Sequence, residues 1–376
     1  MGDAVASAGL AVQGVGEASE VVEGVWQIKL PVPFPLGFVS VYLVEAEDGW
    51  TLIDAGYDYP PAREAWEAGS HAAGCVLSRD VARVVVTHFH PDHVGAARWL
   101  QEVSAAPVFM MEGEIPFARR LWESPDAGPF VGLLVRHGMP REMAETAAKA
   151  MRGGLRLPGE ILPLRAGEEV PMGDGSARVI HAPGHADHQL VLHDEGRRVL
   201  YAADHMMLGI TPNVGIWPET EPRPLARYLG SLASMRGIEA DLVLPGHGPV
   251  FGDLDGRIGE LADHHAGRLD AMRAELEPSP RSAYKVSRNL FRGALTVHQR
   301  AFALAETLAK KTPRHGGEES WRRFLDEHMV DARAMADAAV ARDPVPLRAA
   351  HRRIAESCKS CHEAHRFKPG SGDSPE

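Results

Sequence analysis

The sequence feature that most constrains this chain is the segment THFHPDH, which continues from the apolar run beginning at residue 82. The run is β-branched and apolar, as expected of a buried strand, so the polar segment forms the loop after it. Imidazoles at alternate positions of an extended loop project the same way, and the next Asp and His reach a second point nearby. This spacing suits two adjacent metal ions. The candidate ligands in this loop are His88, His90, Asp92 and His93.

Three later strand-like segments also end in a residue that can bind a metal. RVI leads to His185, VLYAA leads to Asp204, and ADLVLP leads to His247. Taken singly, a His beside a strand is more often a surface or core residue than a ligand, and such an Asp is more often a turn former. Four strand ends that all carry such residues indicate one site on the rim of a sheet.

Elsewhere the sequence predicts a layered α/β protein. Residues 21–53 read as short antiparallel strands, residues 61–77 as a helix, and strands and helices alternate from there onward. The stretch 112–157 has no strand pattern, and we expect a helical insertion that serves as a lid. From residue 256 onward the pattern is helical throughout.

Composition excludes several classes of protein. With 44% apolar and 24% charged residues among 376, the chain is an ordinary globular protein with two or three domains. Because 40 basic residues face 51 acidic ones, nucleic acid and anionic membranes are not the expected partners. There is no apolar run long enough for a membrane span, and the first twenty residues lack a basic signal region, so we expect a cytoplasmic protein. Whether it forms a homo-oligomer stays open.

With these motifs, the chain resembles the metallo-β-lactamase fold hydrolases over roughly Val21 to Asp263. The resemblance implies an αββα sandwich, followed here by an all-helical C-terminal extension. It also implies seven metal ligands. The first ion would be held by His88, His90 and His185, the second by Asp92, His93 and His247, and both by a bridging Asp204. Asp54, in LIDAG, matches a family aspartate that orients a ligand histidine, and we expect a similar supporting role for His188.

Residue chemistry separates the subtypes of this superfamily. True β-lactamases of this fold place other residue types at the positions of Asp92 or Asp204, so antibiotic hydrolysis is disfavoured. The oxygen-reducing di-iron relatives have a glutamate where this chain has His90. What remains resembles the hydroxyacylglutathione hydrolase and lactonase group, and a relative with a C-terminal winged-helix module that includes RNA-cleaving members.

This resemblance implies a binuclear hydrolase. Two divalent ions about 3.5–4 Å apart share a bridging water and lower its pKa, which gives hydroxide at physiological pH. Asp92 is the candidate catalytic residue that orients this hydroxide and handles its proton. With no thiolate ligand, zinc is expected first, and iron and manganese stay as alternatives. The apolar tip at Phe34 and Phe38 and the loop 211–222 with Trp217 favour a small acyl substrate, which is a thioester, ester or lactone. A metal-dependent ribonuclease is the alternative function.

The sequence of the C-terminal third indicates its structure and function less clearly. Residues 264–312 resemble the helical winged-helix module, but KTPRHGGEESW stands where its wing should follow, which weakens any nucleic-acid role. We expect residues 313–367 to form a helical tail, and residues 1–20 and 368–376 to be flexible ends. The tail contains CKSCH, a c-type haem attachment signature at Cys358, Cys361 and His362 that resembles the end of a cytochrome c prime. A hydrolase fused to a haem segment is therefore a further alternative, and two packed thiols on one helical stripe are the other interpretation.

Overall fold

The computed structural model describes residues 14–290, except residues 35, 125, 152–154, 219 and 278. The chain divides into two units at residues 286 and 287, and the architecture below is that of the first unit. The haem signature at Cys358, Cys361 and His362 lies outside the described residues, as do the expected tail 313–367, the end 368–376, residues 1–13 of the leader and residues 291–312 of the 264–312 module.

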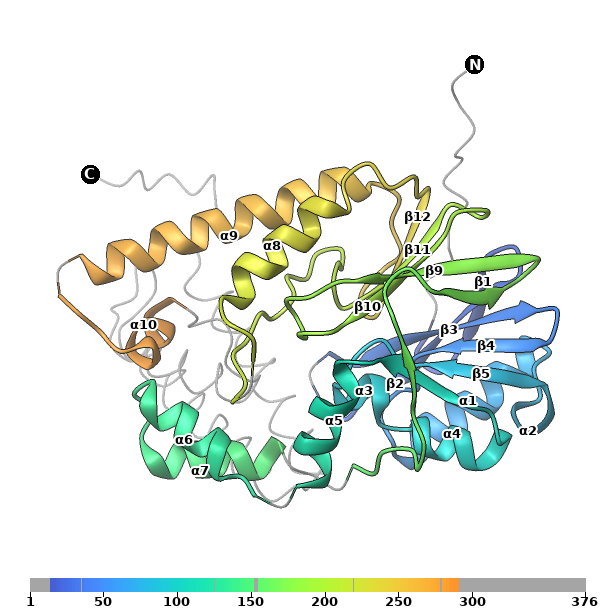
Figure 1. Cartoon of the computed structure of the whole chain (residues 1–376), viewed down its shortest axis with the longest axis horizontal. Helices are drawn as coiled ribbons and strands as arrows, with labels where there is room; N and C mark the ends of the chain where they lie inside the picture. The colour runs from blue at the N-terminus through green and yellow to red at the C-terminus, as the bar shows by residue number, and fades with distance from the viewer. Residues whose placement is uncertain are drawn as a thin grey trace, which may run out of the picture. The chain divides into compact units, whose positions relative to one another are not determined.

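The first sheet has seven strands in sequence order, of which β3, β4 and β5 are seen side by side in Figure 1. Its pairs are antiparallel from β1 to β4 and parallel from β4 to β7. The antiparallel start expected from the sequence is present, but the sheet begins at Ala18 and so includes the end of the expected leader. The strands are β1 (Ala18–Val22), β2 (Val25–Pro31), β3 (Phe38–Ala46), β4 (Gly49–Ile53), β5 (Val81–Val85), β6 (Val108–Met111) and β7 (Leu162–Leu164).

The second sheet has five strands in the order β12-β11-β10-β9-β8. Only the pair of β11 and β12 is parallel. Both of these strands therefore point their carboxyl ends at the same edge, which places the residues after them side by side. The strands are β8 (Glu169–Met172), β9 (Gly175–His181), β10 (Leu190–Asp194), β11 (Val199–Ala203) and β12 (Leu242–Pro245).

Helices cover the outer face of each sheet. Trp66 of α1 (Pro60–Ala72) and Leu100 of α4 (Ala97–Ser104) pack with the buried residues of the first sheet. Tyr228 of α8 (Pro224–Ser234) and Ile258 of α9 (Leu254–Leu276) pack on the second sheet, and α8 and α9 run side by side in Figure 1. The remaining helices are α2 (Leu77–Asp80), α3 (Pro91–Val94), α5 (Glu114–Glu123), α6 (Gly128–Arg136), α7 (Arg141–Met151) and α10 (Ala283–Leu290).

Strand β3 shows how the sequence specifies the layers. Val41 and Leu43 belong to the apolar cluster under the helices, and Tyr42 and Val44 belong to the cluster between the sheets. Because both faces of the strand are covered, its central stretch VYLV is a continuous apolar run without polar alternation. Between the sheets these side chains meet Leu192 and others of the second sheet. The predicted αββα sandwich with a helical continuation is thus confirmed.

The stretch 112–157 is helical but has two parts. Helix α5 packs on the main core through partly buried side chains such as Phe117. Helices α6 and α7 share a small apolar cluster of their own around Val131, Ala144 and Ala148. None of the helices in the described part of the chain is long and apolar enough to cross a membrane.

Candidate metal centre

Asp54 fixes the loop that carries the first ligand motif. It follows strand β4 with a φ of 64°, a left-handed conformation that turns its carboxylate toward the neighbouring strand end. There it accepts a hydrogen bond from the Thr87 backbone N–H at 2.8 Å and one from the Thr87 hydroxyl at 2.9 Å. Its other oxygen lies 2.7 Å from His93 Nδ1. The sequence prediction that Asp54 contacts a histidine of the motif is consistent with this geometry.

Three imidazoles converge in the first ligand cluster. His90 Nδ1 lies 2.9 Å from His88 Nε2 and 2.8 Å from His185 Nε2. Burial and the neighbouring imidazoles hold the pKa of His88 well below its usual value, and they lower the pKa of His90 to about 3. Neutral imidazoles crowded in this way offer their lone pairs to one point, as a metal site requires.

Asp92, His93 and His247 form the second cluster. Asp92 Oδ2 lies 3.2 Å from His247 Nε2 and 4.0 Å from His93 Nε2. Asp92 and His93 are placed by the short helix α3, and His247 follows the end of β12. The two clusters therefore combine residues from both sheets.

Asp204 lies between the clusters. Its Oδ2 is 3.5 Å from His185 Nε2 of the first cluster and 3.5 Å from His247 Nε2 of the second. The preceding residue, Ala203, has a φ of 44°, which turns the chain sharply at the end of β11. Gly246 is required beside it, because a Cβ there would overlap Asp204 Oδ1. This position suits a carboxylate shared by two ions.

The donor atoms fit a pair of cations. His93 Nε2, His247 Nε2 and Asp204 Oδ1 are buried and have no hydrogen-bond partner, which is costly unless something else satisfies them. Burial would lower the pKa of His93, but the surrounding carboxylates of Asp204, Asp54 and Asp92 raise it well above its usual value. The centre thus attracts positive charge. Nitrogen and oxygen donors without a thiolate suit zinc, iron or manganese.

Four ligand histidines face the centre with Nε2 and have a partner on the other ring nitrogen, and for His93 this partner is Asp54. His88 Nδ1 lies 3.0 Å from the Thr87 hydroxyl, which itself donates to Asp54. His185 Nδ1 donates to the Asn213 carbonyl at 2.8 Å, and His247 Nδ1 donates to the Phe38 carbonyl at 2.7 Å. A proton held on Nδ1 leaves the lone pair on Nε2, which orients each ring for a metal.

Two supporting residues were not identified from the sequence. Thr87 was counted only as the start of the motif, and Glu114 was assigned to the expected lid. Glu114 is fully buried, and it accepts hydrogen bonds from the backbone N–H groups of Phe89 and His188. The sequence carries one weak signal for it, namely an acidic residue in the first turn of a helix that directly follows strand β6.

His188 lies in the loop that follows His185. Its ring stacks on His181 with a centroid distance of 5.5 Å, and its backbone, rather than its imidazole, bonds Glu114. Its connection to the ligands runs through the loop it shares with His185.

Aromatic side chains border the first cluster. The Trp217 ring lies 6.2 Å from the His90 ring and 5.4 Å from that of Phe89. It also stacks on Phe130 of α6 at 5.4 Å. Beside it, Ile216 is 54% exposed. The side of the centre next to His90 is therefore apolar, as expected from the sequence.

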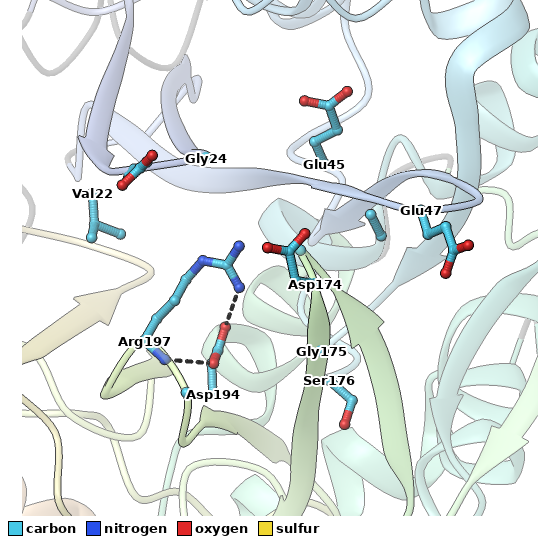
Figure 2. A pocket seen from close by; sticks show the side chains of 13 residues that line it. Val22, Gly24, Glu45, Glu47, Asp174, Gly175, Ser176, Asp194 and Arg197 are labelled. Atoms are coloured by element: carbon cyan, nitrogen blue, oxygen red, sulfur yellow. Dashed lines mark hydrogen bonds and ion pairs between the residues drawn. The ribbon is translucent and has the colours of Figure 1, made fainter.

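A cavity of about 880 Å³ lies at the other end of the sandwich, and Figure 2 shows the side chains that line it. It is lined by the turns before β4, β9 and β11, whereas the ligands follow the carboxyl ends of these or neighbouring strands. Its acidic lining includes Glu45 and Asp174, and the Asp194 carboxylate pairs with Arg197. Ligand chemistry, and not cavity size, locates the candidate site.

Comparisons with known proteins agree with this geometry. The family model described as the metallo-beta-lactamase superfamily matches residues 34–247, and the model of the metallo-beta-lactamase-like C-terminal domain matches residues 269–310. The probable metallo-hydrolase YqjP of Bacillus subtilis is 27% identical, over 72% of this chain and 85% of its own length. The atrochrysone carboxyl ACP thioesterase dmxR1 of a Cryptosporiopsis species is 22% identical, over 72% of this chain and 67% of its own.

A crystal structure of a metallo-beta-lactamase family protein from Thermus thermophilus superposes with a TM-score of 0.67 at 30% sequence identity. The match covers 80% of this chain and 98% of that protein. The family model spans more than half of the chain, and it ends at His247, the last of the candidate ligands. The chain therefore belongs to the metallo-beta-lactamase superfamily, whose members of this kind are metal-dependent hydrolases.

Proposed function

We propose that this protein is a binuclear metal-dependent hydrolase of acyl thioesters, and that esters or lactones are its related substrates. The observation that carries the proposal is the position of Asp204, whose Oδ2 lies 3.5 Å from a donor nitrogen of each cluster. A carboxylate placed in this way joins two three-residue ligand sets into one centre.

The ligands would divide as the clusters do, with zinc as the first choice of metal. Two divalent cations held there supply water activation near neutral pH and polarisation of the scissile oxygen. Asp92 is the residue that orients the attacking water, since its carboxylate lies at the centre, 3.2 Å from His247. Although burial raises the pKa of Asp92, the neighbouring His93 and His247 hold it below its usual value, so the carboxylate is ionised and accepts hydrogen bonds.

Two observations favour an acyl substrate. Trp217, Phe89 and Phe130 form an apolar border beside His90, where an uncharged acyl group gains contact and a polyanion does not. One relative is named as a thioesterase that acts on an acyl carrier protein. The ribonuclease alternative lacks comparable support, because the chain carries a net charge of −11.

The test is a substrate panel on metal-loaded protein. The panel contains acyl thioesters of several chain lengths, a lactone and a single-stranded RNA. We expect thioester turnover, and we expect Asp92→Ala to lose about 100-fold or more of it while the fold persists by circular dichroism. Asp174→Ala, at the opposite end of the sandwich, is the matched control and should keep full activity. Undiminished turnover by the Asp92 variant, or cleavage of RNA alone, would overturn the proposal.

A further inference from the structure

Helix α5 contacts the backbone of both loops that carry the first ligand cluster. Glu114 Oε1 accepts the Phe89 N–H at 3.0 Å, and the Trp122 indole donates to the Phe89 carbonyl at 2.8 Å. Phe89 stands between the ligands His88 and His90, so one helix holds both backbone polar groups of the residue that joins them.

The same carboxylate reaches the loop of the third ligand. Glu114 Oε2 accepts the His188 N–H at 3.1 Å, three residues after His185. Gly113 makes this approach possible, because a Cβ there would lie 2.6 Å from the His188 ring. A single side chain therefore ties together the two loops that bring His88, His90 and His185 to one point.

The second ligand cluster is held by other contacts. His93 bonds Asp54, and His247 bonds the Phe38 carbonyl. The Gly246 carbonyl, next to His247, accepts the Ser40 N–H at 2.7 Å. These partners come from β3 and the end of β4, and not from α5.

The contacts of Glu114 require a carboxylate, because it offers an acceptor oxygen to each of two backbone donors. Both its oxygens face backbone N–H donors, and the side chain is fully buried. A glutamine has the same shape but only one oxygen, so its NH₂ group would face a backbone N–H donor where the carboxylate offers an acceptor. Burial raises the pKa of Glu114 to about 7, which means that holding this carboxylate ionised inside the protein costs free energy.

From this geometry we propose that Glu114 is a positioning residue that sets the affinity of the His88–His90–His185 site for its ion, without affecting the Asp92–His93–His247 site. The inference rests on the two-ion centre of the proposed function, but not on its substrate. It also assigns α5 a structural role at the centre, in contrast to the lid expected from the sequence.

The test measures zinc bound per full-length chain by equilibrium dialysis and elemental analysis. We expect two ions for the wild type, and for Glu114→Gln a loss of about 10–100-fold in affinity for one of them, as for other residues that orient ligands. Glu112→Gln is the matched control, since Glu112 is solvent-exposed and pairs with Arg165. Its binding should equal that of the wild type.

Two further variants, each lacking a ligand of one cluster, show which of the two ions is bound more weakly. In His247→Ala, which retains the first cluster, adding Glu114→Gln should weaken the remaining ion. In His185→Ala, which retains the second cluster, the same change should leave the remaining ion unaffected. Trp122→Phe keeps an aromatic ring but removes the donor to Phe89, so it should weaken the first ion even where Glu114→Gln does not fold.

Equal weakening of both ions, or unchanged binding in Glu114→Gln and Trp122→Phe, overturns the inference. In a further outcome, the variants weaken only the first ion while the wild type hydrolyses no acyl substrate. That result would support the positioning role of Glu114 and contradict the proposed function alone. A wild type that binds a single ion would contradict the two-ion centre and this inference with it.

Discussion

At the scale of single residues, the centre depends on side chains that do not face the ions. Asp54 bonds Thr87 twice and His93 once, and Thr87 in turn bonds His88. This network links one ligand of each cluster to the end of β4. Sequence reasoning identified Asp54 because its LIDAG setting matches a family motif, but Thr87 carries no such signal, since a Thr after a buried strand is ordinary.

Replacing Asp54 by Asn should weaken metal binding in both clusters. The amide keeps the shape but loses the negative charge and one of the two acceptor oxygens, so either His93 or Thr87 loses its partner. We expect zinc affinity to fall by about 10–100-fold, measured by competition with a chelating dye. Asp58→Asn, a partly exposed aspartate that pairs with Arg63, is the control. Affinity equal to that of the wild type would show that Asp54 does not orient the ligands.

Glu114 should also leave a signature in the pH dependence of stability. Its pKa is raised from 4.5 to about 7, with burial as the largest cause and the nearby Asp187 acting in the same direction. The folded protein therefore binds a proton that the unfolded chain releases above pH 4.5. The stability of the wild type relative to Glu114→Gln is thus highest at low pH, and it decreases as pH rises through about 7.

The change between pH 5 and pH 8 should be about 2.5 kcal/mol, since one pKa unit corresponds to about 1.36 kcal/mol. Urea unfolding of the metal-free wild type and Glu114→Gln at both pH values measures it. A stability difference that does not depend on pH, or one that grows as pH rises, would contradict the burial of an ionisable carboxyl at this position.

At the scale of elements, strands that stand out as separate apolar runs were predictable and the others were not. Strands β2 to β5, β9, β11 and β12 follow clear apolar patterns. Strand β6 is the four-residue VFMM with a single β-branched residue, and β10 follows directly on a ligand loop, so neither stands out as a separate strand in the sequence. The role of α5 was also hidden, because nothing in its sequence says that Glu114 points inward.

The pairing of the 211–222 loop with helix α6 should set acyl-chain preference. Trp217 stacks on Phe130 and borders His90, so removing the ring removes apolar contact beside the first cluster. For Trp217→Ala we expect kcat/KM to fall about tenfold for an octanoyl thioester and less than about twofold for an acetyl thioester, since each buried methylene contributes about 0.8 kcal/mol. Trp217→Phe should restore most of the preference. An equal loss on both substrates would exclude a specificity role.

At the scale of the whole molecule, the centre joins the two sheets. The first sheet supplies the motif loop after β5, and the second supplies His185, Asp204 and His247 after its own strand ends. The Leu190 N–H of β10 also donates to the Thr87 carbonyl at 3.0 Å. The pattern of strand ends predicts one site, and the family resemblance implies how its ligands divide, while the fold shows the contacts through which these distant strand ends meet.

Because the ligands lie on both sheets, metal removal should destabilise the whole sandwich. An ion present at about 100 times its dissociation constant stabilises the folded state by about 2.7 kcal/mol. We therefore expect a chelator to lower Tm by several degrees and added zinc to restore it. His185→Ala/His247→Ala, which lacks a ligand in each cluster, should respond much less to the chelator. An unchanged wild-type Tm would mean that no ion bridges the sheets.

The most direct measurement is a crystal structure of zinc-loaded protein with anomalous data collected on both sides of the zinc absorption edge. The account predicts two anomalous peaks, one among His88, His90 and His185 and one among Asp92, His93 and His247, with Asp204 in contact with both. A single peak, or peaks away from these side chains, would contradict it.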